Sequence, residues 1–284
     1  MSGLYFLGIK KSAIKKWPLV KNYFEKRDRK VYQSLLGEIG RDYRIEVVSG
    51  KESSFLYQFK GKEFRIYFRH FPSSDISVFN QVFTLGCYRP IMEKLLETLD
   101  SNQPLRIIDA GGNVGYADLF FKAYFPKAEI VTIEPEQGNC QQLEKNMKDN
   151  GYQLKELVRG GLWHRTANLE VVRDFRDNRE AAFTVRESAA ATDIKGFGFR
   201  EILEKQGWEE ADFVKIDIEG SERFLFDTNE KADAILTRTK FLAIEIHDEF
   251  NIREQIYAHL ERNGFSYFEY DDLTLAVNEK KQQR

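Results

Sequence analysis

The sequence contains little cysteine, proline or histidine: two, six and four residues respectively in a chain of 284. Cys87 and Cys140 stand apart, and neither belongs to a CxxC or zinc-ligand spacing. This excludes a disulfide framework and a cysteine-based zinc site. We therefore expect both thiols to be reduced, as in proteins of the cytoplasm.

Long hydrophobic runs are also missing. No window approaches the roughly 20 apolar residues of a membrane span. In the first residues, MSGLYFLGIKK, the lysines follow a short apolar run, whereas a secretory signal places them before a longer one. The formal net charge of −2 gives no overall reason to expect nucleic acid. We predict a cytoplasmic globular protein with neither a transmembrane segment nor a nucleic-acid partner.

Positive charge is nevertheless concentrated near the N-terminus, where residues 10–30 hold nine lysines and arginines. Four apolar residues recur among them at helical spacing: Ile14, Trp17, Val20 and Phe24. This pattern predicts a basic amphipathic helix. We expect it to pack on its own domain with its basic face in solvent. The alternative is that it lies on an anionic membrane or partner.

Two parts of the chain differ in pattern. Residues 44–50, 54–61 and 62–70 are rich in β-branched and aromatic residues and predict strands, with a hairpin turn at Lys60-Gly61-Lys62. Residues 75–99 have a helical pattern. We therefore predict an N-terminal α+β cap over residues 1–100, a candidate lid, and an alternating β/α domain over residues 101–284.

Strands and helices alternate in this second part. RIIDA, EIVTIE, FVKIDIE and FLAIEIH predict strands that are each followed by helical sequence, and FSYFEY and LTLAV predict a terminal hairpin. Such alternation favours a doubly wound, mostly parallel α/β sheet. Between these elements, Gly196-Phe197-Gly198 is interpreted as a loop or surface turn.

The run DAGGNVG (residues 109–115) follows the apolar strand LRII. A dinucleotide site has the pattern G-x-G-x-x-G, because a pyrophosphate needs successive backbone N–H groups and no carboxylate beside it. Here Gly111, Gly112 and Gly115 follow Asp109 in the pattern D-x-G-x-x-x-G. A carboxylate suits the cationic sulfonium and amino group of S-adenosylmethionine. The turn favours that methyl donor over NAD, and a structural turn without a ligand is the alternative.

Three more predicted strands end in charged or polar side chains. Glu134 lies 25 residues after Asp109, where a carboxylate can accept hydrogen bonds from both ribose hydroxyls of a nucleoside. In VKIDIEGSE three charges share one face of the strand: Lys215, Asp217 and Glu219. FLAIEIH places Glu245 and His247 similarly. Central parallel strands are normally apolar on both faces, so the charges of VKIDIEGSE form either a binding site or a structural ion-pair network. The alternatives are a solvated strand-end glutamate for Glu134 and a structural histidine for His247.

Together these segments resemble the FkbM-type S-adenosylmethionine-dependent methyltransferases. The resemblance rests on DAGGNVG, TIEP with LEKNMKDNG, GGLW, VKIDIEGSE and AIEIH, with SSDISVFNQVFTLGCY before them. It covers roughly residues 73–250 and departs at Gly112, where alanine is usual. It implies a seven-stranded Rossmann-like sheet and S-adenosylmethionine as cofactor. It also implies transfer to a hydroxyl oxygen, often on a sugar or glycosylated natural product, so that the partner is a small molecule or a glycan.

The same resemblance assigns residues to the parts of the donor. The methionine part would be surrounded by the glycine turn: Asp109, Gly111, Asn113 and Gly115. Glu134 would hold the ribose, and the adenine would be bordered by residues of GGLW: Gly161, Leu162 and Trp163. Asp217 would lie beside the transferred methyl group, and Tyr88 would cover the pocket.

An alcohol is a poor nucleophile at neutral pH, so a base must accept its proton as the carbon–oxygen bond forms. The candidates are Asp217, Glu219 and His247, of which we favour Asp217 or His247. A divalent metal such as Mg²⁺ is the alternative, and we do not favour it since no tight ligand motif is visible. For the whole chain, the alternatives are an NAD-dependent protein and a non-catalytic one on the same scaffold.

Overall fold

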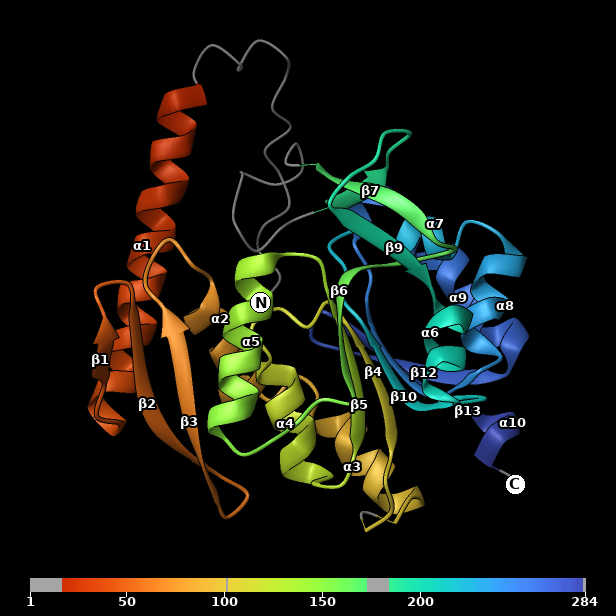
Figure 1. Cartoon of the computed structure of the whole chain (residues 1–284), viewed down its shortest axis with the longest axis horizontal. Coiled ribbons are helices and arrows are strands. Elements are labelled where there is room, and N and C mark those ends of the chain that lie inside the picture. The colour runs from red at the N-terminus through yellow and green to blue at the C-terminus, as the bar shows by residue number, and fades with distance from the viewer. Residues whose placement is uncertain (1–16, 101, 173–183, 283–284) are drawn as a thin grey trace.

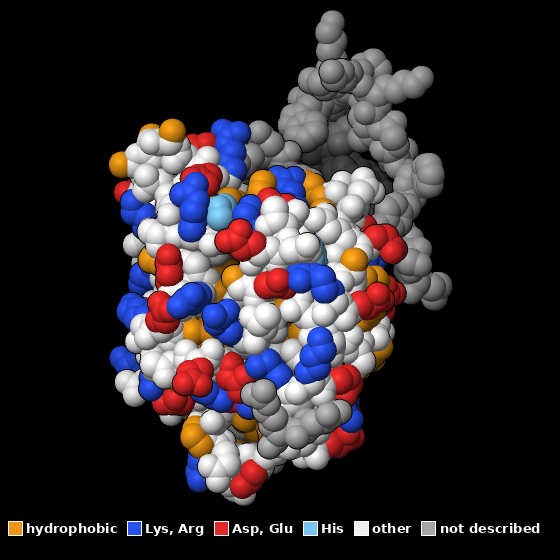
Figure 2. Space-filling model, turned by 90° about the vertical axis from the view of Figure 1, so that its right-hand side faces the viewer, with side chains coloured by type: hydrophobic (Ala, Val, Ile, Leu, Met, Phe, Trp, Pro, Cys, Tyr) orange, Lys and Arg blue, Asp and Glu red, His pale blue; other side chains and the backbone are white. Residues whose placement is uncertain are grey.

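The computed structural model describes residues 17–100, 102–172 and 184–282. A large sheet has helices on both faces, and a smaller sheet from the N-terminal part lies beside it (Figure 1). Within the described ranges, none of the helices has the length and apolar character that crossing a bilayer requires. On the face that carries α8 and α9, acidic and basic side chains are intermixed (Figure 2).

Ten strands of the described residues form the large sheet, in the order β12-β13-β11-β10-β4-β5-β6-β9-β7-β8. Six neighbouring strands run parallel: β11 (Thr239–Glu245), β10 (Ala211–Ile216), β4 (Arg106–Ala110), β5 (Glu129–Glu134), β6 (Glu156–Trp163) and β9 (Ile194–Gly198). The edges add antiparallel neighbours: β13 (Leu273–Asn278) and β12 (Phe265–Tyr270) at one, β7 (Ala167–Val172) and β8 (Thr184–Glu187) at the other. The predicted doubly wound, mostly parallel α/β sheet is confirmed.

Strands β7, β8 and β9 extend the expected seven-stranded sheet to ten. Gly196-Phe197-Gly198 lies in β9, so its interpretation as a loop is wrong. A Cβ on Gly160 would lie 2.3 Å from the Lys195 carbonyl oxygen, and one on Gly196 would lie 2.8 Å from the Trp163 Cβ. Glycine is therefore needed where β6 and β9 pair, although glycine usually counts against a strand.

The two faces of the sheet are buried separately because alternate side chains point to opposite sides. Ile107 and Phe213 belong to one hydrophobic cluster, and their neighbours Ile108 and Val214 belong to the other. The first face is covered by α3 (Arg89–Thr98), α4 (Tyr116–Tyr124) and α5 (Gln137–Asp149). The second is covered by α6 (Phe199–Gln206), α8 (Asn229–Leu236) and α9 (Arg253–Asn263), and short helices are α7 (Glu222–Leu225), η3 (Asp248–Phe250) and α10 (Glu279–Gln282).

The first helix of the described residues is α1 (Trp17–Asp42), which overlaps the predicted basic helix over residues 17–30. Residues 10–16 of that prediction lie outside the described residues. The apolar face predicted for that helix lies outside the residues whose side chains are described. An antiparallel sheet follows, made of β1 (Glu46–Ser49), β2 (Glu52–Phe59) and β3 (Lys62–Arg69). The predicted hairpin is confirmed, with positive φ at Lys60 (49°) and Gly61 (72°). The helical region divides into α2 (Asp75–Phe79), a π-helical turn η2 (Asn80–Leu85) and α3.

The small sheet and the large sheet share one hydrophobic core. Phe59 of β2 stacks on Phe120 of α4 with ring centroids 5.0 Å apart, and Phe83 meets the same ring edge-on at 5.7 Å. All three belong to, or pack against, the cluster on the first face of the large sheet. The domain boundary near residue 100 stays a prediction. Because the N-terminal part shares its core with the large sheet, we expect it to be held rigidly against the β/α domain and not to move as a hinged lid.

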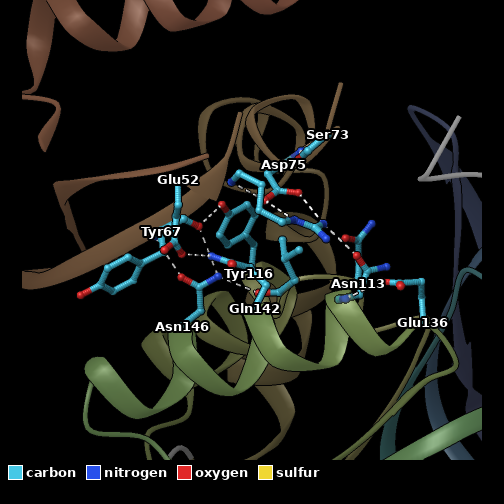
Figure 3. Close-up of polar contacts among 12 residues, drawn as sticks. Glu52, Tyr67, Ser73, Asp75, Asn113, Tyr116, Glu136, Gln142 and Asn146 are labelled. Atoms are coloured by element: carbon cyan, nitrogen blue, oxygen red, sulfur yellow. Dashed lines mark hydrogen bonds and ion pairs between the residues drawn. The ribbon is translucent and has the colours of Figure 1, made fainter. Parts of the chain in front are cut away.

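Strand β3 lies at the edge of the small sheet, and side chains of α5 and of the residue that caps its C-terminus, Asn150, hydrogen-bond to the outer backbone of β3. The Tyr67 N–H donates to Asn146 Oδ1 (3.0 Å), and the Arg65 N–H donates to Asn150 Oδ1 (2.7 Å). The Asn150 amide also donates to the Arg65 carbonyl (2.8 Å). Four helical residues rise about 6 Å and two strand residues about 6.6 Å. The helix therefore matches the strand's spacing, and Figure 3 shows Asn146 beside Tyr67.

We predict that Asn146→Ala destabilises the fold. Asn146 is fully buried, and it also donates to the Val114 carbonyl (2.8 Å). Its loss leaves buried groups unpaired, so the free energy of unfolding should fall by about 1–3 kcal/mol, measured by urea denaturation. Asn102→Ala, in an exposed turn, is the control. Equal stability of the two variants would show that these hydrogen bonds do not hold β3 on α5.

Candidate active site

A cleft of about 600 Å³ opens at the carboxyl ends of β4, β5, β6 and β10. Each strand contributes to its lining: residues 111 and 113, 133–135, 160–162, and 217–219 with 221. Asn139 of α5 and Val185 of β8 complete it. Ligands of open α/β sheets bind at this edge.

The glycine turn brings the ends of β4 and β10 into contact. Gly111 has a φ of 88°, and a Cβ at this position would lie 1.8 Å from the Asp217 carbonyl oxygen. The N–H groups of Gly111 and Gly112 both donate to the Ile133 carbonyl, at 2.9 and 3.1 Å. The turn therefore links three neighbouring strands, and only glycine fits at residue 111.

Glu134 lies at the end of β5 and lines the cleft. Its Oε2 accepts from the Asn113 N–H (2.8 Å), and its Oε1 accepts from the Glu136 N–H (2.9 Å) and the Asn139 amide (3.2 Å). Burial raises the pKa of Glu134 to about 7, although these hydrogen bonds lower the pKa. A carboxylate has about four acceptor positions, so hydroxyl groups of a ligand can still bind to it.

Asn113 places a polar side chain in the same cleft. Its φ of 46° turns the backbone sharply after β4, which asparagine tolerates better than most residues. Its Oδ1 is buried and has no hydrogen-bond partner among the described residues. A donor group on a ligand would satisfy this oxygen.

Asp109 and Lys215 form a buried ion pair beneath the cleft. They are paired in register between β4 and β10, and Lys215 Nζ lies 3.0 Å from Asp109 Oδ1. The ammonium also donates to the Gly111 carbonyl (2.6 Å) and lies 3.6 Å from Asp217 Oδ2. Burial favours the neutral amine, but the charges of Asp109 and Asp217 hold the pKa of Lys215 above its usual value. The alternative of an ion-pair network is confirmed for Lys215.

His247 lies just beyond β11 among three carboxylates. Its Nδ1 is 3.3 Å from Glu222, and its Nε2 is 3.7 Å from Glu219 and 3.8 Å from Glu245. Burial opposes the charged ring, but these carboxylates raise the pKa of His247 to about 11. The surrounding carboxylates therefore favour the protonated ring, which is a poor proton acceptor.

Glu245 is the other titratable group that the sequence pattern placed here. Burial raises its pKa well above the usual value, and the charge of Asp217 adds to the effect. The Asp217 side chain is 28% exposed and lines the cleft directly after β10. Asp217 is therefore, like Glu134 and Glu219, a carboxylate that a ligand in the cleft can contact.

Seven of the predicted site residues line this one cleft: Gly111, Asn113, Glu134, Gly161, Leu162, Asp217 and Glu219. The other five predicted residues are not among those that line the cleft. Gly115 packs on Leu143, and Trp163 packs on Phe224 with ring centroids 4.9 Å apart. Tyr88 is buried against Phe121 (5.4 Å) and is not among the residues that line the cleft. Asp109 and His247 lie in the ion pairs described above, and the functional roles of all these residues remain predictions.

Sequence analysis missed Asn139, Ser221 and Val185 in the cleft lining. The sequence could have pointed to Asn139, because it lies in the first turn of the helix that follows Glu134. Val185 had none, because its place depends on the pairing of β8 with β7. In the described ranges, no group of three or more His, Cys, Asp or Glu side chains is placed to hold a metal ion.

Comparison with known proteins agrees with this geometry. The family described as "Methyltransferase FkbM domain" matches residues 109–267, more than half of the chain. Methyltransferase sdnD of Sordaria araneosa is 25% identical in an alignment of 221 positions, and the match covers 66% of this chain and 81% of that protein.

Solved structures with a similar chain path include a SAM-dependent methyltransferase from Agrobacterium tumefaciens, with a TM-score of 0.47 and 13% identity, over 82% of this chain and 71% of that one. Another is the methyltransferase FkbM from Methylobacillus flagellatus KT, with a TM-score of 0.41 and 16% identity, over 72% of this chain and 53% of that one. The family match itself includes the glycine turn, Glu134 and the ends of β10 and β11.

We predict that Gly112→Ala destabilises the glycine turn and that Thr132→Ser restores it. A Cβ on residue 112 would lie 2.1 Å from the Thr132 Cγ2 methyl group. Serine removes this methyl but keeps the hydroxyl, which donates to Asp118 Oδ2 (2.9 Å). Overpacking should lower the free energy of unfolding by about 1–3 kcal/mol, and the double variant should regain most of it in a urea titration.

The single variant Thr132→Ser is the control, and it should be close to the wild type apart from the lost methyl. If the effects of Gly112→Ala and Thr132→Ser simply add, the Thr132 methyl is not what excludes alanine at residue 112.

Proposed function

The chain belongs to the FkbM family of S-adenosylmethionine-dependent methyltransferases, and on that premise we propose that it methylates a hydroxyl oxygen of a sugar or of a glycosylated or other natural product. One observation carries the proposal: a single cleft joins Glu134 and Asn113 to the carboxylates of Asp217 and Glu219. O-methyl transfer needs a donor pocket with a proton acceptor beside it.

The residues of the cleft fit the donor. We assign Glu134 to the ribose hydroxyls, and the unpartnered Asn113 Oδ1 to the donor's amino group. We assign Gly161 and Leu162 of β6 to the border of the adenine, and Gly111, which also lines the cleft, to the methionine part. When bound, S-adenosylmethionine supplies an electrophilic methyl group.

Asp217 is the residue that we assign as proton acceptor. It follows β10 at the cleft, and Lys215 lies 3.6 Å from its Oδ2, so its side chain is held at this edge of the sheet. We assign a different role to His247: a protonated ring among Glu219, Glu222 and Glu245 offsets part of their negative charge. Asp217 and His247 were the two favoured bases. Because its raised pKa makes His247 a poor proton acceptor, we assign the base to Asp217.

We predict that Asp217→Asn abolishes most of the turnover while the donor pocket stays intact. Wild-type protein is incubated with S-adenosylmethionine and a panel of sugars, glycosides and hydroxylated natural products, and S-adenosylhomocysteine is measured by mass spectrometry. With the best acceptor, Asp217→Asn should lower kcat by about 100-fold or more, since general-base catalysis contributes that much. Asp227→Asn, at an exposed ion pair with Lys231, is the control.

Methylation of amines or thiols but not of alcohols in this panel would contradict the assignment of O-methyl transfer. Full turnover by Asp217→Asn, combined with its loss in His247→Gln, would move the base to His247.

We predict that affinity for S-adenosylhomocysteine rises with pH between about 6 and 8. The pKa of Glu134 is raised to about 7, so the carboxyl group is protonated below this pH and accepts fewer hydrogen bonds. Binding through the ionised form should weaken toward tenfold per pH unit below the midpoint. Isothermal titration at several pH values measures this. Glu134→Gln should bind weakly without this slope; a slope that persists in Glu134→Gln would assign it to another group.

A further inference from the structure

Arg69, at the end of β3, reaches from the small sheet to α5. Its Nε donates to Asp75 Oδ2 (3.1 Å) and its Nη2 donates to Asp75 Oδ1 (2.8 Å), while Asp75 is fully buried. The same Nη2 donates to Asn139 Oδ1 (2.8 Å). One guanidinium group therefore joins a fixed carboxylate of the cap to a side chain that lines the cleft.

Asn139 passes this contact on to Glu134. Its backbone N–H donates to Glu136 Oε2 (2.6 Å), which fixes the residue at the start of α5. Its side-chain amide has one oxygen and one NH₂ group. Because the oxygen accepts from Arg69, the NH₂ group is turned toward Glu134 Oε1 (3.2 Å). Figure 3 shows polar contacts running from Ser73 and Asp75 toward Glu136.

We propose that Arg69 is a positioning residue for methyl-donor binding, which acts through Asn139 to hold the Glu134 carboxylate in place for the ribose. The proposal rests on the proposed function of Glu134. It assigns part of the donor site to the N-terminal segment, which lies outside the residues that match the family. A reversed amide would place the Asn139 oxygen against the carboxylate, and the contact with Arg69 prevents this.

Several charged groups share the surroundings of Glu134. Glu136 follows it at the start of α5, Lys215 lies on the side of β10, and Asp217 and Glu219 line the same cleft. These groups remain in every variant below. The hydrogen bond from Asn139 lowers the pKa of Glu134, so its loss should raise the pH at which donor affinity declines, a change that altered fold stability alone does not produce.

The test compares binding of S-adenosylhomocysteine by isothermal titration from pH 6 to 9. Arg69→Met is combined with Asp75→Asn, so that no buried carboxylate is left unpaired. This pair and Asn139→Ala should each raise Kd about tenfold, as expected for one hydrogen bond to a charged group. Both should also move the pH midpoint upward. Combining all three substitutions should weaken binding no further than Asn139→Ala alone.

Arg65→Met is the matched control, because Arg65 lies on the same strand and its guanidinium bonds to Glu46 (2.9 Å) at the surface. Asn139→Asp is a second test that leaves the cap contacts in place: it still accepts from Arg69 but turns an oxygen toward Glu134. It should bind more weakly than the wild type, with a higher pH midpoint.

The outcomes separate the two proposals. If the wild-type protein does not bind S-adenosylhomocysteine, the donor site itself is wrong and the role of Arg69 falls with it. If the wild type binds, and the double variant Arg69→Met, Asp75→Asn has the same affinity and pH midpoint as Arg65→Met, then Arg69 does not position Glu134 for the donor. Unchanged binding by Asn139→Asp, or additive losses in the combined variant, would also overturn the proposal.

Discussion

The buried ammonium group of Lys215 holds together the edge of the sheet on which the cleft is built. It pairs with Asp109 across the β4–β10 register, bonds to the Gly111 carbonyl, and lies near Asp217. A buried charge is tolerated only when its partners satisfy it. The same contacts that satisfy Lys215 therefore fix the glycine turn on one side and the proposed base on the other.

Charge is arranged differently on the two sides of this ammonium group. Toward β5, Glu134 is held by N–H groups and an amide, so its protonation depends on burial and neutral donors. Toward β11, Glu219 and Glu245 surround the imidazolium of His247. The first arrangement leaves acceptor positions for a neutral hydroxyl group. The second keeps negative charge near the cleft while limiting repulsion among the carboxylates.

The alternation of strands and helices and the location of the cleft at the strand ends could be predicted from the sequence, because both follow local patterns. Period-two alternation and the spacing of DAGGNVG place Gly111, Glu134 and Asp217 at strand ends, and parallel strands bring such ends together. The partner of Lys215 could not be predicted, since it depends on strand register. Arg69 and Asn139 were also missed, because their contact is made between segments 70 residues apart. The glycines of β9 were misleading, because close strand packing and loops both use glycine.

The amides of α5 complete the edge of β3 in place of a further strand. Asn146 and Asn150 come 79 and 85 residues after the backbone groups that they bind. During synthesis on the ribosome, the aromatic-rich β2–β3 hairpin is therefore made well before the helix that covers it. Until then its outer N–H and C=O groups are open, and such an edge can pair with another chain. The long delay between hairpin and helix therefore exposes the nascent N-terminal segment to misassociation.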